Sequence, residues 1–158
     1  MNLIFLARLF QGLILIMATV FIHGVGTVAF LRMLYRYRPY WEKHGGIVVN
    51  TLSLTWVVGT LVMLHLLEIA VWALFYWMGQ IYPTFETSLY FSLVTYTTVG
   101  FGDVVPPVTW RVFASFEALV GILMCAWSTA LLMAVVNSVH SKTLTFWKAK
   151  DAENFRKP

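Results

Sequence analysis

Three long apolar stretches, separated by shorter polar segments, dominate the pattern of this chain. They cover residues 9–34, 47–78 and 110–139. A helix needs roughly 20 apolar residues to cross the hydrocarbon core of a bilayer, and each stretch exceeds that length. The pattern therefore predicts three transmembrane helices. The first stretch is too long for a secretory signal peptide and lacks a convincing cleavage site, so we expect it to be retained.

A fourth apolar segment, residues 85–96, is too short to span a membrane. Thr84 before it is a typical N-cap, and Glu86 suits the positive end of a helix. The sequence TTVGFGD follows at residues 97–103, with two glycines flanking one aromatic residue. Irregular backbone at membrane depth is tolerated only inside protein or beside a water-filled cavity. We therefore expect a half-helix that enters the membrane and a loop that returns.

The composition agrees with an all-α membrane protein. Of 158 residues, 59% are hydrophobic and only 11% are charged, against about 25% charged in soluble domains. Nine of the eleven Lys and Arg residues lie in the segment after the first stretch or in the C-terminal segment. The positive-inside rule then puts the N-terminus outside and the C-terminus in the cytoplasm of a multi-pass cell-membrane protein. This grouping explains the net charge of +4 without a nucleic-acid partner.

The ends of the predicted spans carry recognisable surface groups. Aromatic residues typical of the membrane interface cluster near the outer side, and they are Tyr76, Trp77, Tyr82 and Trp110. On the inner side, arginines suited to anionic lipid are Arg32, Arg36 and Arg38. They lie at the end of a span, not inside it, so they do not make a voltage sensor. We expect residues 151–158 to be loose.

The sequence LYFSLVTYTTVGFGD, residues 89–103, resembles the pore helix and selectivity filter of potassium channels. The likeness is greatest to the small bacterial members with two pore-forming helices. It covers about residues 47–141 and leaves out the first span. Phe101 replaces the usual tyrosine. The resemblance implies three transmembrane helices with a re-entrant pore helix and filter, assembled as a homotetramer, because a closed ring needs four loops.

The resemblance and the apolar pattern together divide the chain into three expected parts. Residues 1–46 would form an extra N-terminal transmembrane helix with a basic cytoplasmic loop. Residues 47–141 form the pore domain, and residues 142–158 form a short basic cytoplasmic tail.

The resemblance also implies roles for individual residues. Backbone carbonyls, together with the Thr98 hydroxyl, would bind K⁺ in a filter made of Thr98, Val99, Gly100, Phe101 and Gly102. Tyr90, Asp103 and Glu117 would support the filter, with a hydrogen bond from Tyr90 to Asp103. Gly121 looks like the family's gating glycine. Helical spacing would put a set of third-span residues on the pore side, namely Ile122, Cys125, Thr129, Met133 and Asn137.

Polar residues also lie at membrane depth. Thr19, His23 and Thr27 follow one another at four-residue spacing in the first span, and His65 and Glu68 share a face of the second. Antiparallel spans would bring them to one depth. This set is either an interhelical network that docks the first helix or a proton sensor. A His/Glu metal site lacks a third clear ligand. Glu117 is either a brace behind the filter or a structural hydrogen-bonding partner of the pore helix.

The function expected from these features is passive, potassium-selective conduction. A weakly selective cation channel is one alternative. An accessory or transporter subunit of a potassium uptake system is another, although such transporters usually carry four degenerate pore repeats in one chain. No nucleophile lies beside a base and no phosphate loop is present, so we expect no enzyme activity and no cofactor other than potassium ions.

Overall fold

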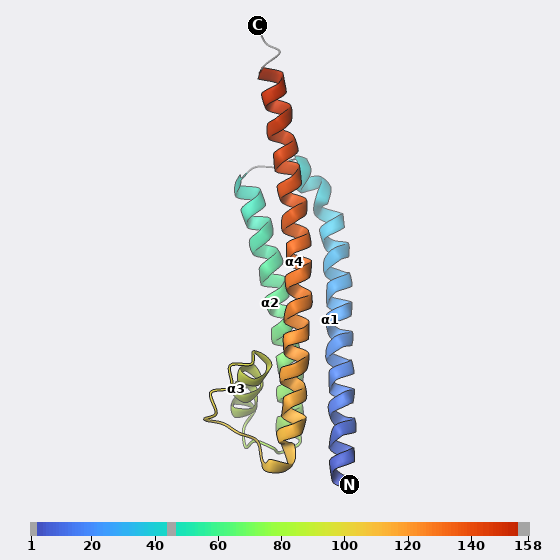
Figure 1. The fold of residues 1–158 in the computed structure, drawn as a ribbon, viewed down its shortest axis with the longest axis vertical. Coiled ribbons are helices and arrows are strands. Elements are labelled where there is room, and N and C mark those ends of the chain that lie inside the picture. Colours follow the sequence, from blue (N-terminus) through green and yellow to red (C-terminus); the bar gives the residue numbers. More distant parts are fainter. Residues whose placement is uncertain (1–2, 44–46, 155–158) are drawn as a thin grey trace.

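The computed structural model describes residues 3–43 and 47–154. Its elements are α1 (Leu3–Lys43), α2 (Ile47–Met78), α3 (Phe85–Tyr96), the short 3₁₀ turn η1 (Val108–Trp110) and α4 (Arg111–Asn154), with no strand within these ranges. Three long helices lie side by side, and the short α3 lies at one end of the bundle (Figure 1). The protein is therefore all-α, as predicted.

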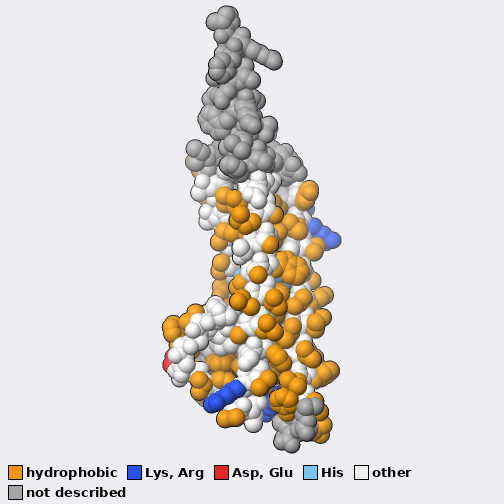
Figure 2. Space-filling view, viewed as in Figure 1, with side chains coloured by type: hydrophobic (Ala, Val, Ile, Leu, Met, Phe, Trp, Pro, Cys, Tyr) orange, Lys and Arg blue, Asp and Glu red, His pale blue; other side chains and the backbone are white. Residues whose placement is uncertain are grey.

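Three segments are long and apolar enough to cross a membrane, namely Phe5–Tyr37, Val48–Met78 and Val108–Ser138. Hydrophobic side chains cover most of the visible face of the bundle (Figure 2). In water such a surface would be unstable, whereas lipid accommodates it. The three predicted transmembrane helices are thus confirmed, and α2 begins and ends at the predicted residues.

Two expectations about the polar segments were wrong. The backbone of α1 stays helical to Lys43, through most of the segment expected as a loop. Likewise α4 continues to Asn154, so residues 151–154 are helical and not loose, whereas residues 155–158 of the same expectation lie outside the described residues. Residues 140–154 contain neither Gly nor Pro, so nothing in the sequence interrupts the helix once it leaves the membrane. The apolar pattern marks where a helix crosses lipid, not where it ends.

The ends of the helices sort into two groups. The start of α1, the end of α2, α3 and the start of α4 lie at one end of the molecule (Figure 1). The ends of α1 and α4 and the start of α2 lie at the opposite end. The glycine-containing loop and the predicted cytoplasmic segments are therefore on opposite sides, as a three-span topology requires.

Aromatic side chains form the core that holds α3 against α2 and α4. Tyr76 is fully buried. The centre of its ring lies 5.2 Å from the ring centre of Phe91 in α3 and 5.9 Å from the ring centre of Phe113 in α4. Tyr82 is also buried, 4.9 Å from the Phe91 ring. Tyr76 and Tyr82 are thus core residues and not interface anchors, because the re-entrant segment covers them. Trp77 stays 46% exposed.

Glycines allow α1 to approach its neighbours closely. A Cβ on Gly12 would lie 2.4 Å from the Phe116 ring of α4, and one on Gly26 would lie 2.5 Å from Leu64 of α2. Small residues commonly permit such close packing of transmembrane helices. At the same end as Gly12, the Arg8 guanidinium lies 3.4 Å from the centre of the Trp110 ring. Helix α1 is therefore packed against both α2 and α4.

Gly12→Ala should weaken the docking of α1, because Phe116 must move to admit the methyl group. Overpacking of this kind costs about 1–3 kcal/mol. Gly24→Ala is a matched control, since its Cβ would meet nothing within 4 Å and its gain in helix propensity is the same. We expect thermal unfolding in detergent to occur at a lower temperature for Gly12→Ala than for Gly24→Ala. Equal midpoints would contradict this account of the α1 contact.

Candidate functional site

The half-helix α3 begins and ends where the sequence predicts. The Thr84 hydroxyl accepts a hydrogen bond from the Thr87 backbone N–H at 3.1 Å, and Glu86 lies in the first turn. With 12 residues, α3 is only about 18 Å long, too short to cross a membrane. Its C-terminal carbonyls, which carry partial negative charge, end at the TTVGFGD loop.

The backbone of this loop alternates in handedness. Thr98, Gly100 and Gly102 have positive φ values of 60°, 57° and 79°, whereas Val99 and Phe101 between them do not. In ordinary extended backbone successive carbonyls point to opposite sides, and alternating the sign of φ brings them towards the same side. A β-branched residue such as Thr98 rarely adopts positive φ, and strain of this kind clusters at functional sites.

The loop is fastened to the end of α3 and open on its other side. The Thr98 N–H donates to the Thr95 carbonyl at 2.9 Å, and the Gly100 N–H donates to the Val94 carbonyl at 3.2 Å. Val99 and Phe101 remain 54% and 71% exposed. The hydrogen bonds to α3 therefore fix the start of the loop, whereas Val99 and Phe101 farther along it stay exposed.

Asp103 at the end of the loop has the predicted partner. The Tyr90 hydroxyl donates to Asp103 Oδ2 at 2.6 Å, and the Val104 N–H donates to Oδ1 at 3.0 Å. The hydrogen bond from Tyr90 lowers the pKa of Asp103 below its ordinary value. Asp103 therefore keeps its negative charge at the mouth of the loop and links the loop back to α3.

Glu117 of α4 is fully buried and joins three helices. The Tyr76 hydroxyl of α2 donates to its Oε2 at 2.7 Å, and its Oε1 is in a short hydrogen bond with Ser92 of α3. The Ser92 hydroxyl also lies 2.9 Å from the Ile69 carbonyl. The Ser92 hydroxyl is therefore the group of α3 that joins Glu117 of α4 to the backbone of α2. The structural hydrogen bond to the pore helix, one of the two interpretations of Glu117, is present.

A second buried cluster forms where His23 of α1 meets Glu68 of α2. His23 Nδ1 lies 2.8 Å from Glu68 Oε1, and both side chains have no exposed surface. The Tyr96 hydroxyl of α3 donates to Glu68 Oε2 and lies 3.1 Å from His65 Nδ1. Ser128 of α4 lies 3.4 Å from His23 Nε2. All four helices therefore meet in this cluster, which we call the four-helix polar cluster.

The threonines beside His23 behave differently from each other. The Trp72 indole N–H of α2 donates to the Thr19 hydroxyl at 2.9 Å. Thr27 is buried too, but its hydroxyl has no hydrogen-bond partner among the described residues. The predicted meeting of the two stripes is confirmed at His23 and Glu68. Thr19 pairs with Trp72 instead, and the facing of Thr27 stays a prediction.

The cluster also contains a possible set of metal ligands. Donor atoms of His23, His65 and Glu68 all lie within 4.8 Å of one another. His23 is thus the third ligand that the second span alone did not supply. However, Glu68 already accepts a hydrogen bond from Tyr96 and contacts His23. A metal ion would have to displace these contacts, so the arrangement fits a hydrogen-bonded network better than an ion site.

Tyr96 and Ser128 were not singled out from the sequence as partners of this cluster. Both are hydroxyl residues at membrane depth, yet each lies on a helix whose pairing with α1 the sequence does not specify. A polar side chain in a span predicts that a partner exists but not which helix supplies it.

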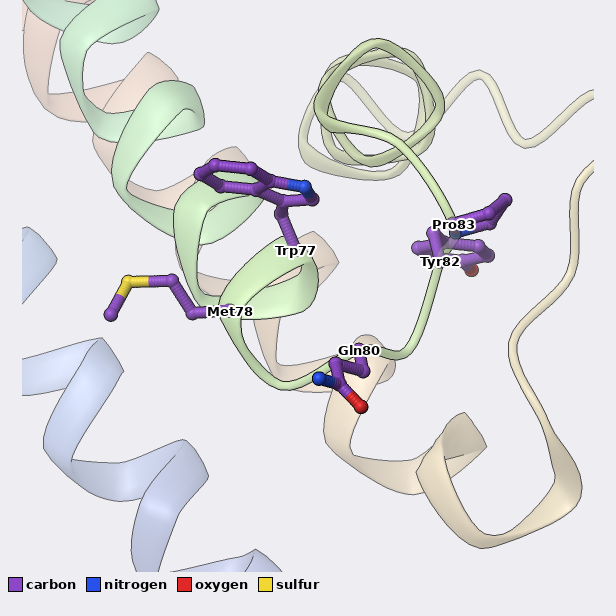
Figure 3. Close-up of a pocket in the computed structure, with 5 residues that line it drawn as sticks. All are labelled: Trp77, Met78, Gln80, Tyr82 and Pro83. Carbon is purple, nitrogen blue, oxygen red and sulfur yellow. The ribbon is translucent and has the colours of Figure 1, made fainter.

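A separate hollow lies where α2 ends, lined by Trp77, Met78, Gln80, Tyr82 and Pro83 (Figure 3). Gln80 has a positive φ of 52° there, which fits the tight turn after the helix. The side chains that line it include one amide, the Tyr82 hydroxyl and the Trp77 indole, and none of them is charged.

Residues 52–138 match the family model described as an ion channel. This range is more than half of the chain. The chain belongs to this ion channel family. The match begins in α2, contains α3 and the TTVGFGD loop, ends in α4 and leaves α1 outside. No curated protein and no solved structure matches the chain.

The fourth helix of this ion channel has two different faces around Gly121. A Cβ on Gly121 would lie 2.2 Å from the Tyr96 carbonyl oxygen, so this glycine admits the end of α3. The helix is continuous through Gly121, and its gating role stays a prediction. The residues predicted to line the pore are all exposed, and their pore-lining role stays a prediction; they are Ile122, Cys125, Thr129, Met133 and Asn137.

The arginines predicted to contact lipid lie in the C-terminal part of α1, and Arg32 and Arg36 fall within the candidate span Phe5–Tyr37. Arg32 and Arg36 are exposed there, and the side chain of Arg38 is outside the described residues. Contact with anionic lipid stays a prediction.

Gly121→Ala should displace the end of the pore helix. The new methyl group would clash with backbone, which no change of rotamer relieves, so we expect a loss of about 1–3 kcal/mol in stability. Cation selectivity should fall with it. Gly59→Ala in α2 is the control, because its Cβ meets nothing within 4 Å. Thermal unfolding and ion flux in liposomes measure both effects. A glycine that served only as a hinge would instead leave selectivity and stability unchanged in Gly121→Ala.

Tyr90→Phe should make ion flux more sensitive to external acid. Losing the hydrogen bond lets the pKa of Asp103 rise towards its ordinary value of 3.8. In the wild type, the contribution of ionised Asp103 to ion flux is fully present above pH 3.8 and is lost as the pH falls through the lowered pKa of Asp103. In Tyr90→Phe this loss begins at higher pH. Flux measured between about pH 3 and 5 at low salt, where screening is weak, should therefore fall earlier in the variant. An unchanged acid midpoint would contradict the role of this hydrogen bond.

Proposed function

We propose that this ion channel conducts potassium selectively and passively, through a pore at the centre of four identical subunits. The observation that carries the proposal is the alternation of φ at Thr98, Gly100 and Gly102. In potassium channels, rings of backbone carbonyls replace the water shell of the ion. Carbonyls brought to one side of a loop, at the C-terminal end of a half-helix, suit that task.

The proposed ligands are backbone oxygens and one hydroxyl. They are the carbonyls of Thr98, Val99, Gly100 and Phe101 with the Thr98 hydroxyl, and Gly102 completes the loop. The partial negative charge at the end of α3 favours a cation beside Thr98. Asp103 adds a negative charge at the outer mouth, which raises the local cation concentration.

Four copies are proposed because one loop supplies only one side of a ring. The exposure of Val99 and Phe101 fits a surface that other copies complete. A hollow between the loop and α4, lined in part by Ala114, Ser115 and Ala118, leaves room for a neighbouring copy. The exposed face of α4 that contains Thr129 and Met133 would line the inner half of the pathway.

The membrane side is part of the proposal. The filter would face outside with the N-terminus, and the basic ends of α1 and α4 would lie in the cytoplasm. Weakly selective cation conduction and a subunit role in potassium uptake are the alternative outcomes of the flux experiment below.

Gly100→Ala should lower potassium-over-sodium selectivity or stop conduction. Its φ of 57° opposes a side chain, although a Cβ would meet nothing within 4 Å. The left-handed conformation costs an L residue about 1–2 kcal/mol, and a tetramer would contain it four times. Gly59→Ala has equally open space around the new Cβ but lies in a helix, so it isolates the effect of the backbone.

The measurement is cation flux in liposomes, with potassium and sodium compared for the wild type and both variants. We expect a potassium preference in the wild type and in Gly59→Ala, and its reduction in Gly100→Ala. Equal potassium and sodium flux in the wild type would favour the weakly selective channel. No flux from well-folded protein would favour the subunit role.

A further inference from the structure

We propose that α1, which lies outside the matched family range, is part of the filter support. His23 acts as a positioning residue for the selectivity filter, through a buried chain of contacts that runs from His23 to Glu68 and from Glu68 to Tyr96. The proposal deepens the proposed function, on which it rests, and gives the extra helix a role in ion selection.

This chain of contacts ends at Tyr96, next to the proposed filter. Tyr96 is the last residue of α3 and directly precedes Thr97 and Thr98. Its side chain is only 1% exposed, and its carbonyl lies against Gly121. The position of Tyr96 therefore sets where the filter begins. A shift of its ring would move the backbone that holds Thr98 in its left-handed conformation.

The middle of this chain of contacts is the Glu68 carboxyl group, which is contacted by Tyr96 on one side and by His23 on the other. Oε2 of Glu68 accepts from Tyr96, and Oε1 lies 2.8 Å from His23 Nδ1. Glu68 has no exposed surface, and an unpaired polar atom at membrane depth is costly. Without His23, Oε1 must find another donor by rotation or take up a proton. Either change alters the hydrogen bond to Tyr96.

His23 also contacts α4. Its Nε2 lies 3.4 Å from the Ser128 hydroxyl, and its ring centre lies 5.4 Å from that of Trp127. These contacts fix the ring so that Nδ1 faces Glu68. His65, 17% exposed and 3.1 Å from the Tyr96 hydroxyl, supports the same end of the chain from α2. Helix α1 therefore reaches the pore helix through polar contacts, with α4 as its backing.

The hydrogen bond between Trp72 and Thr19 provides a matched control. It joins the same two helices one turn away, is also buried, and measures 2.9 Å. It contacts α2 but includes no residue of α3. Docking of α1 by itself should depend on both hydrogen bonds, whereas positioning of the filter should depend only on the one through Glu68.

The experiment compares His23→Leu, His23→Asn, Tyr96→Phe and Thr19→Val with the wild type. Leu removes the polar contact, Asn keeps a polar amide near the position of Nδ1, and Phe removes only the hydroxyl at the far end. We expect His23→Leu and Tyr96→Phe to reduce the potassium-over-sodium flux ratio several-fold. His23→Asn should retain most of the ratio. Thr19→Val should lower the thermal midpoint but leave the ratio unchanged.

A second readout does not depend on potassium selectivity. Amide hydrogen exchange of the peptide covering residues 94–104 should become faster in His23→Leu and Tyr96→Phe, but not in Thr19→Val. The double variant of His23 and Tyr96 should add little to either single change, because both interrupt one chain.

The outcomes separate the two proposals. If the wild type does not prefer potassium but exchange at residues 94–104 responds as expected, the proposed selectivity fails and the positioning role of His23 stands. If folded His23→Leu keeps the wild-type flux ratio and exchange, or if Thr19→Val changes both to the same extent, the positioning role is overturned. Should His23→Leu fail to fold, Tyr96→Phe with a wild-type ratio and wild-type exchange also overturns it.

Discussion

The architecture depends on one constraint: α3 ends beside Glu68, within the length of the candidate span Val48–Met78, where polar groups that face lipid or protein cannot be satisfied by water. The protein must supply every partner. It does so with an aromatic core around Tyr76 and with carboxyl groups from the two flanking helices. Glu117 reaches the middle of α3 at Ser92, and Glu68 reaches its end at Tyr96. The short helix is thus held by side chains from α2 and α4, which explains why two acidic residues are tolerated at full burial.

These two buried carboxyl groups differ in their surroundings. Glu68 faces hydroxyl and imidazole groups that can all donate, which suits an ionised carboxylate beside His23. Glu117 instead faces two hydroxyl groups, those of Tyr76 and Ser92.

Much of this arrangement follows from local sequence rules. Hydropathy predicted three spans, and α2 matched to the residue. The cap at Thr84 and the length of α3 followed from side-chain chemistry, and the Tyr90–Asp103 hydrogen bond followed from family resemblance. The ends of α1 and α4 did not follow, because hydropathy ceases to report on a helix outside lipid. The burial of Tyr82 was also missed, since it depends on how the re-entrant segment folds back.

The four-helix polar cluster shows where sequence reasoning reaches its limit. The spacing of His23, His65 and Glu68 indicated that polar faces meet at one depth, but it could not indicate that Tyr96 would complete the set. That contact requires α3 to end at the level of Glu68, which depends on the length of α3 and on Gly121 admitting its last carbonyl. A single added Cβ there would separate Tyr96 from both α4 and Glu68. The close approach of two backbones at Gly121 therefore determines whether a polar residue on α1 can be coupled to the loop at all.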